Sequence, residues 1–224
     1  TLAVSRNLKK MGVEHITLAP VGLDLTLLNN DYYNCNATKL KQKYGYRAED
    51  KELLFIGRLS DEKQPLKMIE IFSELLGKQE NYKLLIVGTG ELKDTVNAVI
   101  QKNAIKGNVQ MIDRIPNSDI WELYRFVEAF INLNQQEIFG MAILEAMYYG
   151  CKVIAWEAPG PNLIIENGIS GWLVASDKDV IDKVQDKTDM SLAAHKRIKD
   201  NFTWNNAANI IQQLLRGENN EQEN

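Results

Sequence analysis

The chain has 224 residues, 45% of them hydrophobic, which is enough to bury the core of one large α/β domain. Its 26 basic and 30 acidic residues give a net charge of −4, so no broad attraction to nucleic acid or to an anionic bilayer is expected. The sequence has neither the run of about 18 to 20 apolar residues that predicts a membrane span nor an N-terminal signal core. We therefore expect a cytoplasmic protein that does not bind nucleic acid.

Cysteine and histidine are too sparse to predict a metal site. Cys35 and Cys151 lie far apart, without C-x-x-C spacing or a neighbouring histidine, so reduced thiols are expected. His15 and His195 are also isolated in the sequence and are expected to be solvated or packed. We expect no metal and no cofactor.

The first 30 residues predict a helix over Ser5–Met11 and a short strand over His15–Leu18, followed by a turn. The segment 29–36 is polar and loop-like. Because the chain starts with Thr1 in what reads as a helix, we expect a piece of a longer protein. Residues 1–30 would then be the tail of a preceding domain and a linker.

Apolar runs of strand length then alternate with helical patterns. The predicted strands are Leu53–Ile56, Lys83–Val87, Val109–Ile112, Ala129–Leu133 and Val153–Trp156. A tight hairpin cannot reach a parallel neighbour, so this alternation predicts parallel strands with helical crossovers. We expect an α/β fold, with a doubly wound, Rossmann-like parallel sheet over residues 31–190 that binds its ligand beyond the strands' carboxyl ends. Residues 191–216 predict helices, and residues 217–224 a disordered tail.

Two basic residues follow the first predicted strand. Gly57 permits close backbone approach, while Arg58 and Lys63 have the charge to hold a diphosphate and to neutralise a leaving phosphate. A solvated turn with ordinary surface charges is the alternative.

The loops after the second and third strands are weaker signals. Gly88 and Gly90 lack the third glycine of G-x-G-x-x-G, because Lys93 stands there, so they predict a tight turn that lets a ligand or the backbone approach. Asp113–Asn117 leads to Ser118, which is predicted to cap the next helix. Backbone groups of this loop are candidates for contact with the edge of a base, although side-chain identity carries no signal of such a contact.

The segment Glu137–Glu145 is the strongest signal. Gly140 lies where a strand gives way to a helix, and the free N–H groups around Phe139–Ala142 predict an anion site. Glu137 and Glu145 bracket that site and are suited to accept hydrogen bonds from hydroxyls of a sugar and a ribose. The alternative is that Glu137 merely complements the helix N-terminus and Glu145 is a surface residue.

Together these motifs resemble glycosyltransferase family 4, the group 1 glycosyl transferases. The matching segments are Phe55–Ser60 with Lys63, Ile86–Gly90, Glu137–Glu145 and Gly168–Val174, in the family's order. The resemblance implies a GT-B fold whose C-terminal, donor-binding half is this chain, with retaining transfer from a nucleotide sugar, most often a UDP-sugar, without a metal. It also implies that the missing N-terminal domain binds a glycan, lipid or protein acceptor, and leaves open peripheral membrane association through that domain.

The resemblance assigns roles to individual residues. Arg58 and Lys63 would hold the diphosphate and Glu137 would lie beside the donor sugar, which makes these three the expected catalytic residues. The expected donor-binding residues are Gly57, Gly88, Ile112, Arg114, Ile138, Phe139, Gly140, Met141, Ala142 and Glu145, of which the last would bind the ribose hydroxyls. A leaving nucleotide diphosphate is already acidic, so the glutamates are not expected to work as a glycosidase acid and nucleophile.

Three positions depart from the family's pattern. Asn134 stands where the family often has Ser, Leu163 where it commonly has Glu, and Asp113 where Gly is frequent. These departures keep open a non-catalytic partner subunit that retains a GT-B domain for assembly or regulation. A GT-B epimerase or phosphorylase is a third hypothesis, and the Glu137–Glu145 pattern argues against it. The chain alone is expected to bind the donor and to transfer nothing.

Overall fold

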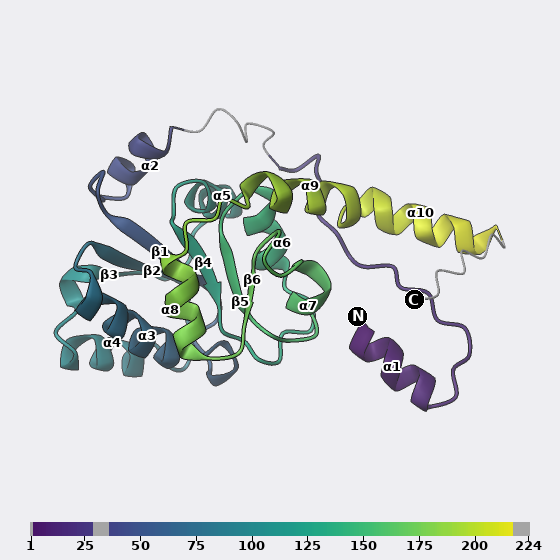
Figure 1. The fold of residues 1–224 in the computed structure, drawn as a ribbon, viewed down its shortest axis with the longest axis horizontal. Coiled ribbons are helices and arrows are strands. Elements are labelled where there is room, and N and C mark those ends of the chain that lie inside the picture. Colours follow the sequence, from purple (N-terminus) through teal and green to yellow (C-terminus); the bar gives the residue numbers. More distant parts are fainter. Residues whose placement is uncertain (1, 29–35, 217–224) are drawn as a thin grey trace.

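A computed structural model describes residues 2–28 and 36–216 of the chain (Figure 1). The predictions for Cys35 and for the tail 217–224 lie outside the described residues, as does most of the polar segment 29–36. The strands of the described part are β1 (Lys51–Ile56), β2 (Tyr82–Val87), β3 (Val109–Ile112), β4 (Ala129–Asn132), β5 (Val153–Trp156) and β6 (Trp172–Val174). Its α-helices are α1 (Leu2–Lys10), α2 (Ala37–Lys43), α3 (Pro65–Lys78), α4 (Lys93–Lys102), α5 (Asn117–Tyr124), α6 (Met141–Tyr148), α7 (Pro161–Ile164), α8 (Asp177–Gln185), α9 (Ser191–Asn201) and α10 (Trp204–Leu215), and the 3₁₀ turns are η2 (Asp61–Lys63) and η3 (Lys106–Asn108).

The strands form one parallel sheet in the order β3-β2-β1-β4-β5-β6. The chain builds outward from β1 to β3 and then returns to the other side of β1, so the order reverses between β1 and β4. Ligands of doubly wound sheets bind outside the carboxyl ends of the strands at such a point. The predicted α/β architecture is confirmed, and the five predicted strands all form; β6 is an additional edge strand.

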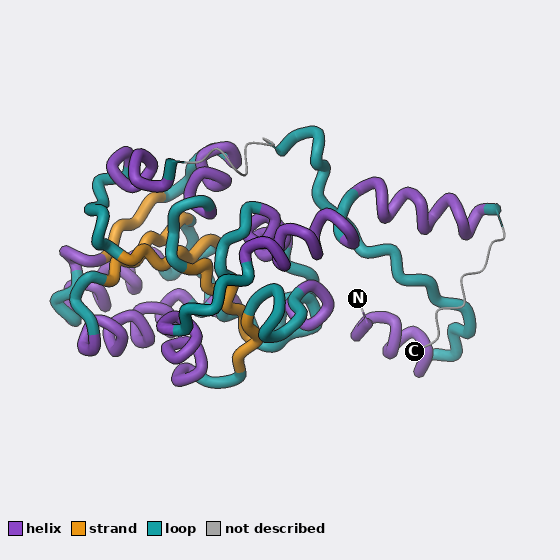
Figure 2. The backbone as a smooth tube through the Cα atoms, turned by 45° about the horizontal axis from the view of Figure 1, so that its top comes forward, coloured by secondary structure: helices purple, strands orange, loops and turns teal. Residues whose placement is uncertain are grey.

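Helices cover both faces of the sheet, and Figure 2 shows the strands running between them. Successive residues of a strand point to opposite faces. Accordingly Leu53 and Phe55 of β1 belong to the core beneath α3, α4 and α8, whereas Leu54 belongs to the core beneath α5, α6 and α9. Burial on both sides is the reason why β1 and β2 are almost continuously apolar.

The strand predicted over His15–Leu18 does not form, because none of the strands in the described part of the chain pairs with this segment to satisfy its backbone groups. The chain runs irregularly to Leu23, whose backbone N–H donates to the Phe202 carbonyl at 2.8 Å and whose carbonyl accepts from Trp204 at 3.0 Å. Gly22 is required there, since a Cβ would lie 2.4 Å from the backbone of Thr203. This contact joins the first segment to the junction of α9 and α10.

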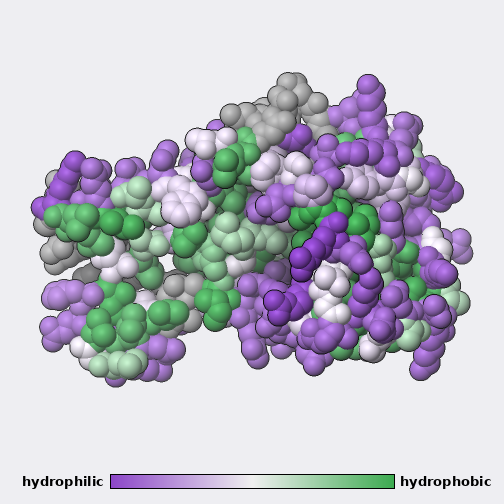
Figure 3. All heavy atoms as spheres, turned by 180° about the vertical axis from the view of Figure 1, so that it is seen from behind, coloured by the Kyte–Doolittle hydropathy of each residue, from purple (hydrophilic) through white to green (hydrophobic). Residues whose placement is uncertain are grey.

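The helices predicted over residues 191–216 are confirmed as α9 and α10. Figure 1 shows α10 extending away from the sheet on the side where α1 also lies, and no residue of α10 is buried. Seen from behind, apolar side chains gather over this end of the molecule (Figure 3). Ile211, Leu214 and Leu215 of α10 are among the exposed ones. None of the described helices is both long and apolar enough to cross a bilayer.

The predicted cap of α5 is wrong. The helix begins at Asn117 with Pro116 at the N-cap position, so Ser118 lies inside the first turn and caps nothing. Pro116 has an extended ψ of 151°, and its ring fixes φ, so the backbone enters the helix without a side-chain cap.

Candidate functional site

Lys63 and Glu137 meet in front of the carboxyl ends of β1 and β4, where the strand order reverses. Lys63 Nζ lies 2.8 Å from Glu137 Oε2, and the two side chains are 25% and 16% exposed. Lys63 belongs to the η2 turn after β1, and its stem passes over Gly57, where a Cβ would lie 3.6 Å from the Lys63 Cγ. Two residues 74 positions apart are thus joined at the place predicted for a ligand.

Two asparagines missed as functional candidates hold the Glu137 carboxylate. Asn134 Nδ2 donates to Glu137 Oε2 at 3.2 Å, and Asn132 Nδ2 approaches the same oxygen at 3.4 Å. The asparagines are themselves fixed, since Asn132 Oδ1 accepts from the Asn134 backbone and Asn134 Oδ1 accepts from the Gln136 backbone. Asn134, which departs from the family pattern, is 5% exposed and orients Glu137. In the sequence, Asn134 stands out by its place after a strand and as a departure from the family pattern, and neither signal indicates a contact with Glu137.

The glycines after β2 allow neighbouring loops to touch, which confirms the predicted close approach of the backbone. Gly88 has φ +149°, and a Cβ there would lie 1.9 Å from the Gly57 carbonyl oxygen. A Cβ at Gly90 would lie 2.4 Å from the Leu59 carbonyl oxygen. Backbone bonds join the same loops, from Gly57 N to the Val87 carbonyl and from Leu59 N to that of Thr89, both at 3.1 Å. These glycines therefore set the position of the loop that carries Arg58.

The start of α6 is open, as the sequence predicts. Gly140 takes φ +103°, a conformation that L side chains rarely adopt, and no described side chain caps the helix. The first-turn N–H groups of an uncapped helix attract anions. The apolar side chains of Ile138 and Met141 are 60% and 41% exposed on either side of this turn, and Phe139 between them is half-buried.

Glu145 lies one turn inside α6 and is half-buried. Loss of hydration raises the pKa of this carboxyl from 4.5 to about 7. Glu145 is near the buried Tyr124 hydroxyl, because its charge adds to the burial that raises the pKa of that phenol. Neither glutamate is therefore an ordinary surface residue.

The other predicted residues, Arg58, Ile112 and Arg114, lie on or beside the loops that follow β1 and β3. The side chains of Arg58 and Arg114 are exposed, and neither side chain forms an ion pair or hydrogen bond with another described residue. Ile112 is half-buried, and its carbonyl accepts from Gly88 N at 2.9 Å. Asp113 is ion-paired with Lys93 at 2.6 Å. Ile112 is thus tied to the loop cluster by its backbone, whereas no hydrogen bond or ion pair among the described residues joins the Arg114 side chain to Lys63 or Glu137.

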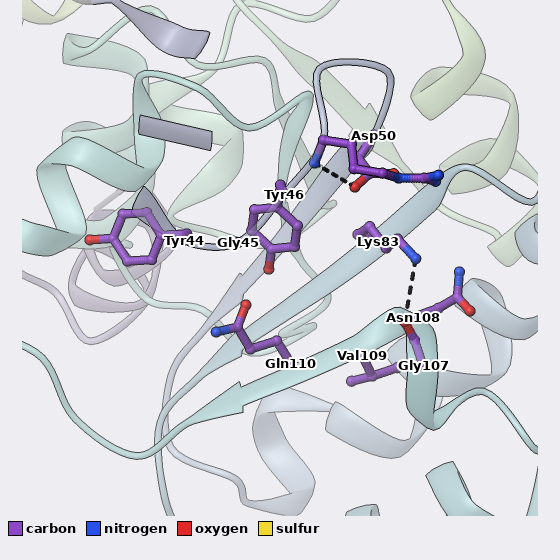
Figure 4. A pocket seen from close by; sticks show the side chains of 10 residues that line it. Tyr44, Gly45, Tyr46, Asp50, Lys83, Gly107, Asn108, Val109 and Gln110 are labelled. Atoms are coloured by element: carbon purple, nitrogen blue, oxygen red, sulfur yellow. Dashed lines mark hydrogen bonds and ion pairs between the residues drawn. The ribbon is translucent and has the colours of Figure 1, made fainter. Parts of the chain in front are cut away.

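Two hollows lie at the opposite, amino ends of the strands. One has a volume of about 290 Å³. Residues before β1 and at the starts of β2 and β3 line it (Figure 4). Its charges already have partners: Arg47 is 3.1 Å from Asp50, and Lys83 donates to the Gly107 carbonyl at 3.3 Å. The other, of about 310 Å³, lies by the starts of β4 and β5. Neither contains a predicted site residue, and within the described ranges no three His, Cys, Asp or Glu side chains are grouped to hold a metal ion.

A doubly wound parallel sheet with its loop cluster at the reversal point is the Rossmann-like architecture of GT-B glycosyltransferase structures. The chain belongs to the family "Glycosyl transferases group 1", whose model matches residues 36–203.

Its relatives and structural neighbours are longer proteins or parts of them. The chain is 26% identical to the alpha-monoglucosyldiacylglycerol synthase of Streptococcus pneumoniae over 72% of this chain and 37% of the relative. Among solved structures, Anabaena HepE in complex with UDP and glucose superposes with a TM-score of 0.71 at 21% identity, over 88% of this chain and 54% of that one. The C-terminal domain of a group 1 protein, LpcC of Francisella tularensis, superposes with a TM-score of 0.70 at 21% identity. This superposition covers 82% of this chain and 100% of that domain. The chain spans about two fifths of the length of the curated relatives it matches.

Glu145→Gln is expected to change how stability depends on pH. The folded pKa of Glu145, about 7, lies above its ordinary value of 4.5, so the stability linked to its protonated form is full below about pH 4.5 and is lost as the pH rises through 7. A glutamine cannot ionise, so the variant does not lose this stability. Its free energy of unfolding relative to that of the wild type should therefore be about 2 kcal/mol higher at pH 8 than at pH 5. Urea unfolding of both proteins at the two pH values measures the gain; a difference that is constant with pH would contradict the burial of the Glu145 charge.

Proposed function

We propose that this chain is the C-terminal, donor-binding half of a retaining glycosyltransferase that uses a UDP-sugar without a metal. The observation that carries the proposal is the 2.8 Å contact between Lys63 Nζ and Glu137 Oε2 at the point where the strand order reverses. A cation, a carboxylate and the open start of α6 converge there, which are the partners that a sugar diphosphate requires. A preceding domain would bind the glycan, lipid or protein acceptor.

Each group has a separate part in the proposed reaction. Arg58 and Lys63 neutralise the charge that develops on the leaving diphosphate, helped by the N–H groups of α6. Glu137, oriented by the two asparagines, accepts hydrogen bonds from hydroxyls of the donor sugar. Glu145 does the same for the ribose. The Lys63–Glu137 pair holds both side chains at the site before a ligand binds. Donor binding therefore has a small entropic cost for immobilising these side chains.

The comparisons support the choice of nucleotide and of domain. HepE was solved with UDP and glucose, and a pneumococcal O-GlcNAc transferase with UDP and GlcNAc. The neighbour from Francisella is described as a C-terminal domain, and the superposition includes all of it.

Calorimetric titration with UDP, GDP and ADP tests the proposal, on this chain and on the full-length protein. UDP should bind more tightly than the other two. Folded full-length protein that binds none of the three would overturn the assignment.

The non-catalytic subunit stays the alternative, and a turnover assay separates the two. Full-length protein supplied with UDP-sugars and a mixture of glycan and lipid acceptors should release UDP. Tight UDP binding without release of UDP from any donor would favour the partner subunit.

A further inference from the structure

We propose that Arg197 is a positioning residue for the turn that carries Glu137, and that it acts through the short helix α7. The inference deepens the proposed function and rests on it where donor binding is concerned. Arg197 lies on α9, outside every loop that the sequence singles out. Its guanidinium instead contacts the end of α7, whose beginning touches the Glu137 turn.

The guanidinium satisfies the carbonyl groups that α7 leaves open. Arg197 Nη2 donates to the Leu163 carbonyl at 3.2 Å, and Nε donates to the Ile164 carbonyl. Nη1 lies 3.4 Å from the Glu166 carboxylate. A helix of four residues cannot pair its last carbonyls internally. A planar fork can bond two adjacent carbonyls from one fixed position, and a positive charge at a helix C-terminus is favourable.

The other end of α7 is in backbone contact with the candidate site. The Gly160 N–H donates to the Glu137 carbonyl at 2.8 Å. The approach is so close that a Cβ on Gly160 would lie 2.1 Å from the Phe139 carbonyl oxygen. Between the two ends, Ile164 is fully buried in the core beneath α6. Contacts thus run without a break from Arg197 through α7 to the backbone of Glu137.

The connection from Arg197 to Glu137 should matter more for binding the sugar of the donor than for binding its diphosphate. The Glu137 carboxylate is proposed to meet the sugar, whereas Arg58 meets the diphosphate from a different loop. Loss of the Arg197 fork should therefore loosen α7 and the Glu137 turn, and should weaken recognition of the sugar more than recognition of UDP, which Arg58 also holds.

The first test measures amide hydrogen exchange in the full-length protein without ligand. In Arg197→Gln, exchange in segments 137–140 and 158–165 should be about tenfold faster, the scale expected from losing hydrogen bonds to a charged group. Arg197→Lys, which keeps the charge without the fork, should lie between this variant and the wild type. Lys199→Gln on the same helix, exposed and unpaired among the described residues, is the matched control. Unchanged exchange in 137–140 in Arg197→Gln would overturn the inference.

The second test compares the dissociation constants of UDP and of the UDP-sugar that the wild type binds best. Arg197→Gln should reduce the preference for the sugar nucleotide at least about threefold, a ΔΔG of roughly 0.7 kcal/mol, because the loss of affinity is larger for the sugar nucleotide than for UDP. An equal loss for both ligands would mean that Arg197 supports the fold alone, and would also overturn the inference. Wild-type protein that binds no nucleotide would instead refute the proposed function, and the exchange experiment would still decide the role of Arg197.

Discussion

Arg58→Ala is expected to weaken UDP binding by about 10- to 100-fold, because a charge-assisted hydrogen bond contributes about 1.5 to 3 kcal/mol. Arg58 is exposed on the loop after β1 and its side chain forms no ion pair or hydrogen bond in the described structure, so its guanidinium donors are available for a ligand. Uridine lacks the diphosphate, and its affinity should change less than about twofold. Calorimetry for UDP and an NMR titration for uridine measure the two effects.

The control for Arg58 is a cation of similar exposure far from the reversal point. Lys102 ends α4 and is exposed. Lys102→Ala should leave UDP affinity unchanged at physiological ionic strength, because distant surface charges are screened. Equal losses of UDP and uridine in Arg58→Ala, or an equal loss of UDP in both variants, would contradict the role given to Arg58.

Gly88→Ala is expected to destabilise the chain by about 3 to 5 kcal/mol, through backbone strain and overpacking combined. Its Cβ would lie 1.9 Å from the Gly57 carbonyl oxygen, and φ +149° is strained for any L side chain. The clash is with backbone, so relief requires the loop that carries Arg58 to move. Protein that remains folded should therefore also lose UDP affinity. Guanidinium unfolding gives the first effect and calorimetry the second.

A helical glycine provides the contrast. Gly77 lies in α3, and a Cβ there would meet nothing within 4 Å. Gly77→Ala should be neutral or stabilising by up to about 1 kcal/mol, because alanine loses less entropy in a helix. If Gly88→Ala were as harmless as Gly77→Ala, the close approach of the two loops would be wrong.

Local sequence patterns predicted most of the fold, because most of its strands and helices have an apolar pattern that can be recognised within the segment itself. The apolar runs of β1 and β2 follow from burial on both faces, and the helices between them follow from their amphipathic spacing. The failures have local causes too. His15–Leu18 has the alternation of a strand but no partner strand among the described residues, and Ser118 is a good capping residue two positions too late.

The candidate site was predictable as a set of loops but not as a set of contacts. Motifs named Lys63 and Glu137 separately, and only the structure joins them. Asn134 was noted as a departure from the family, although its amide orients Glu137. Arg197 gave no signal, because side-chain bonds to backbone carbonyls depend on a distant segment that no sequence motif describes.

By itself the sequence determined the alternation of strands and helices, and with it a parallel, doubly wound sheet whose ligand loops follow the strands. The tertiary structure alone decided which loops meet. Strand order places β4 beside β1, so residues 74 positions apart form one ion pair, and burial moves the pKa of Glu145 to about 7. The physical reason is that periodicity reflects each segment's own environment, whereas neighbouring strands and the loss of hydration arise only when the whole core packs.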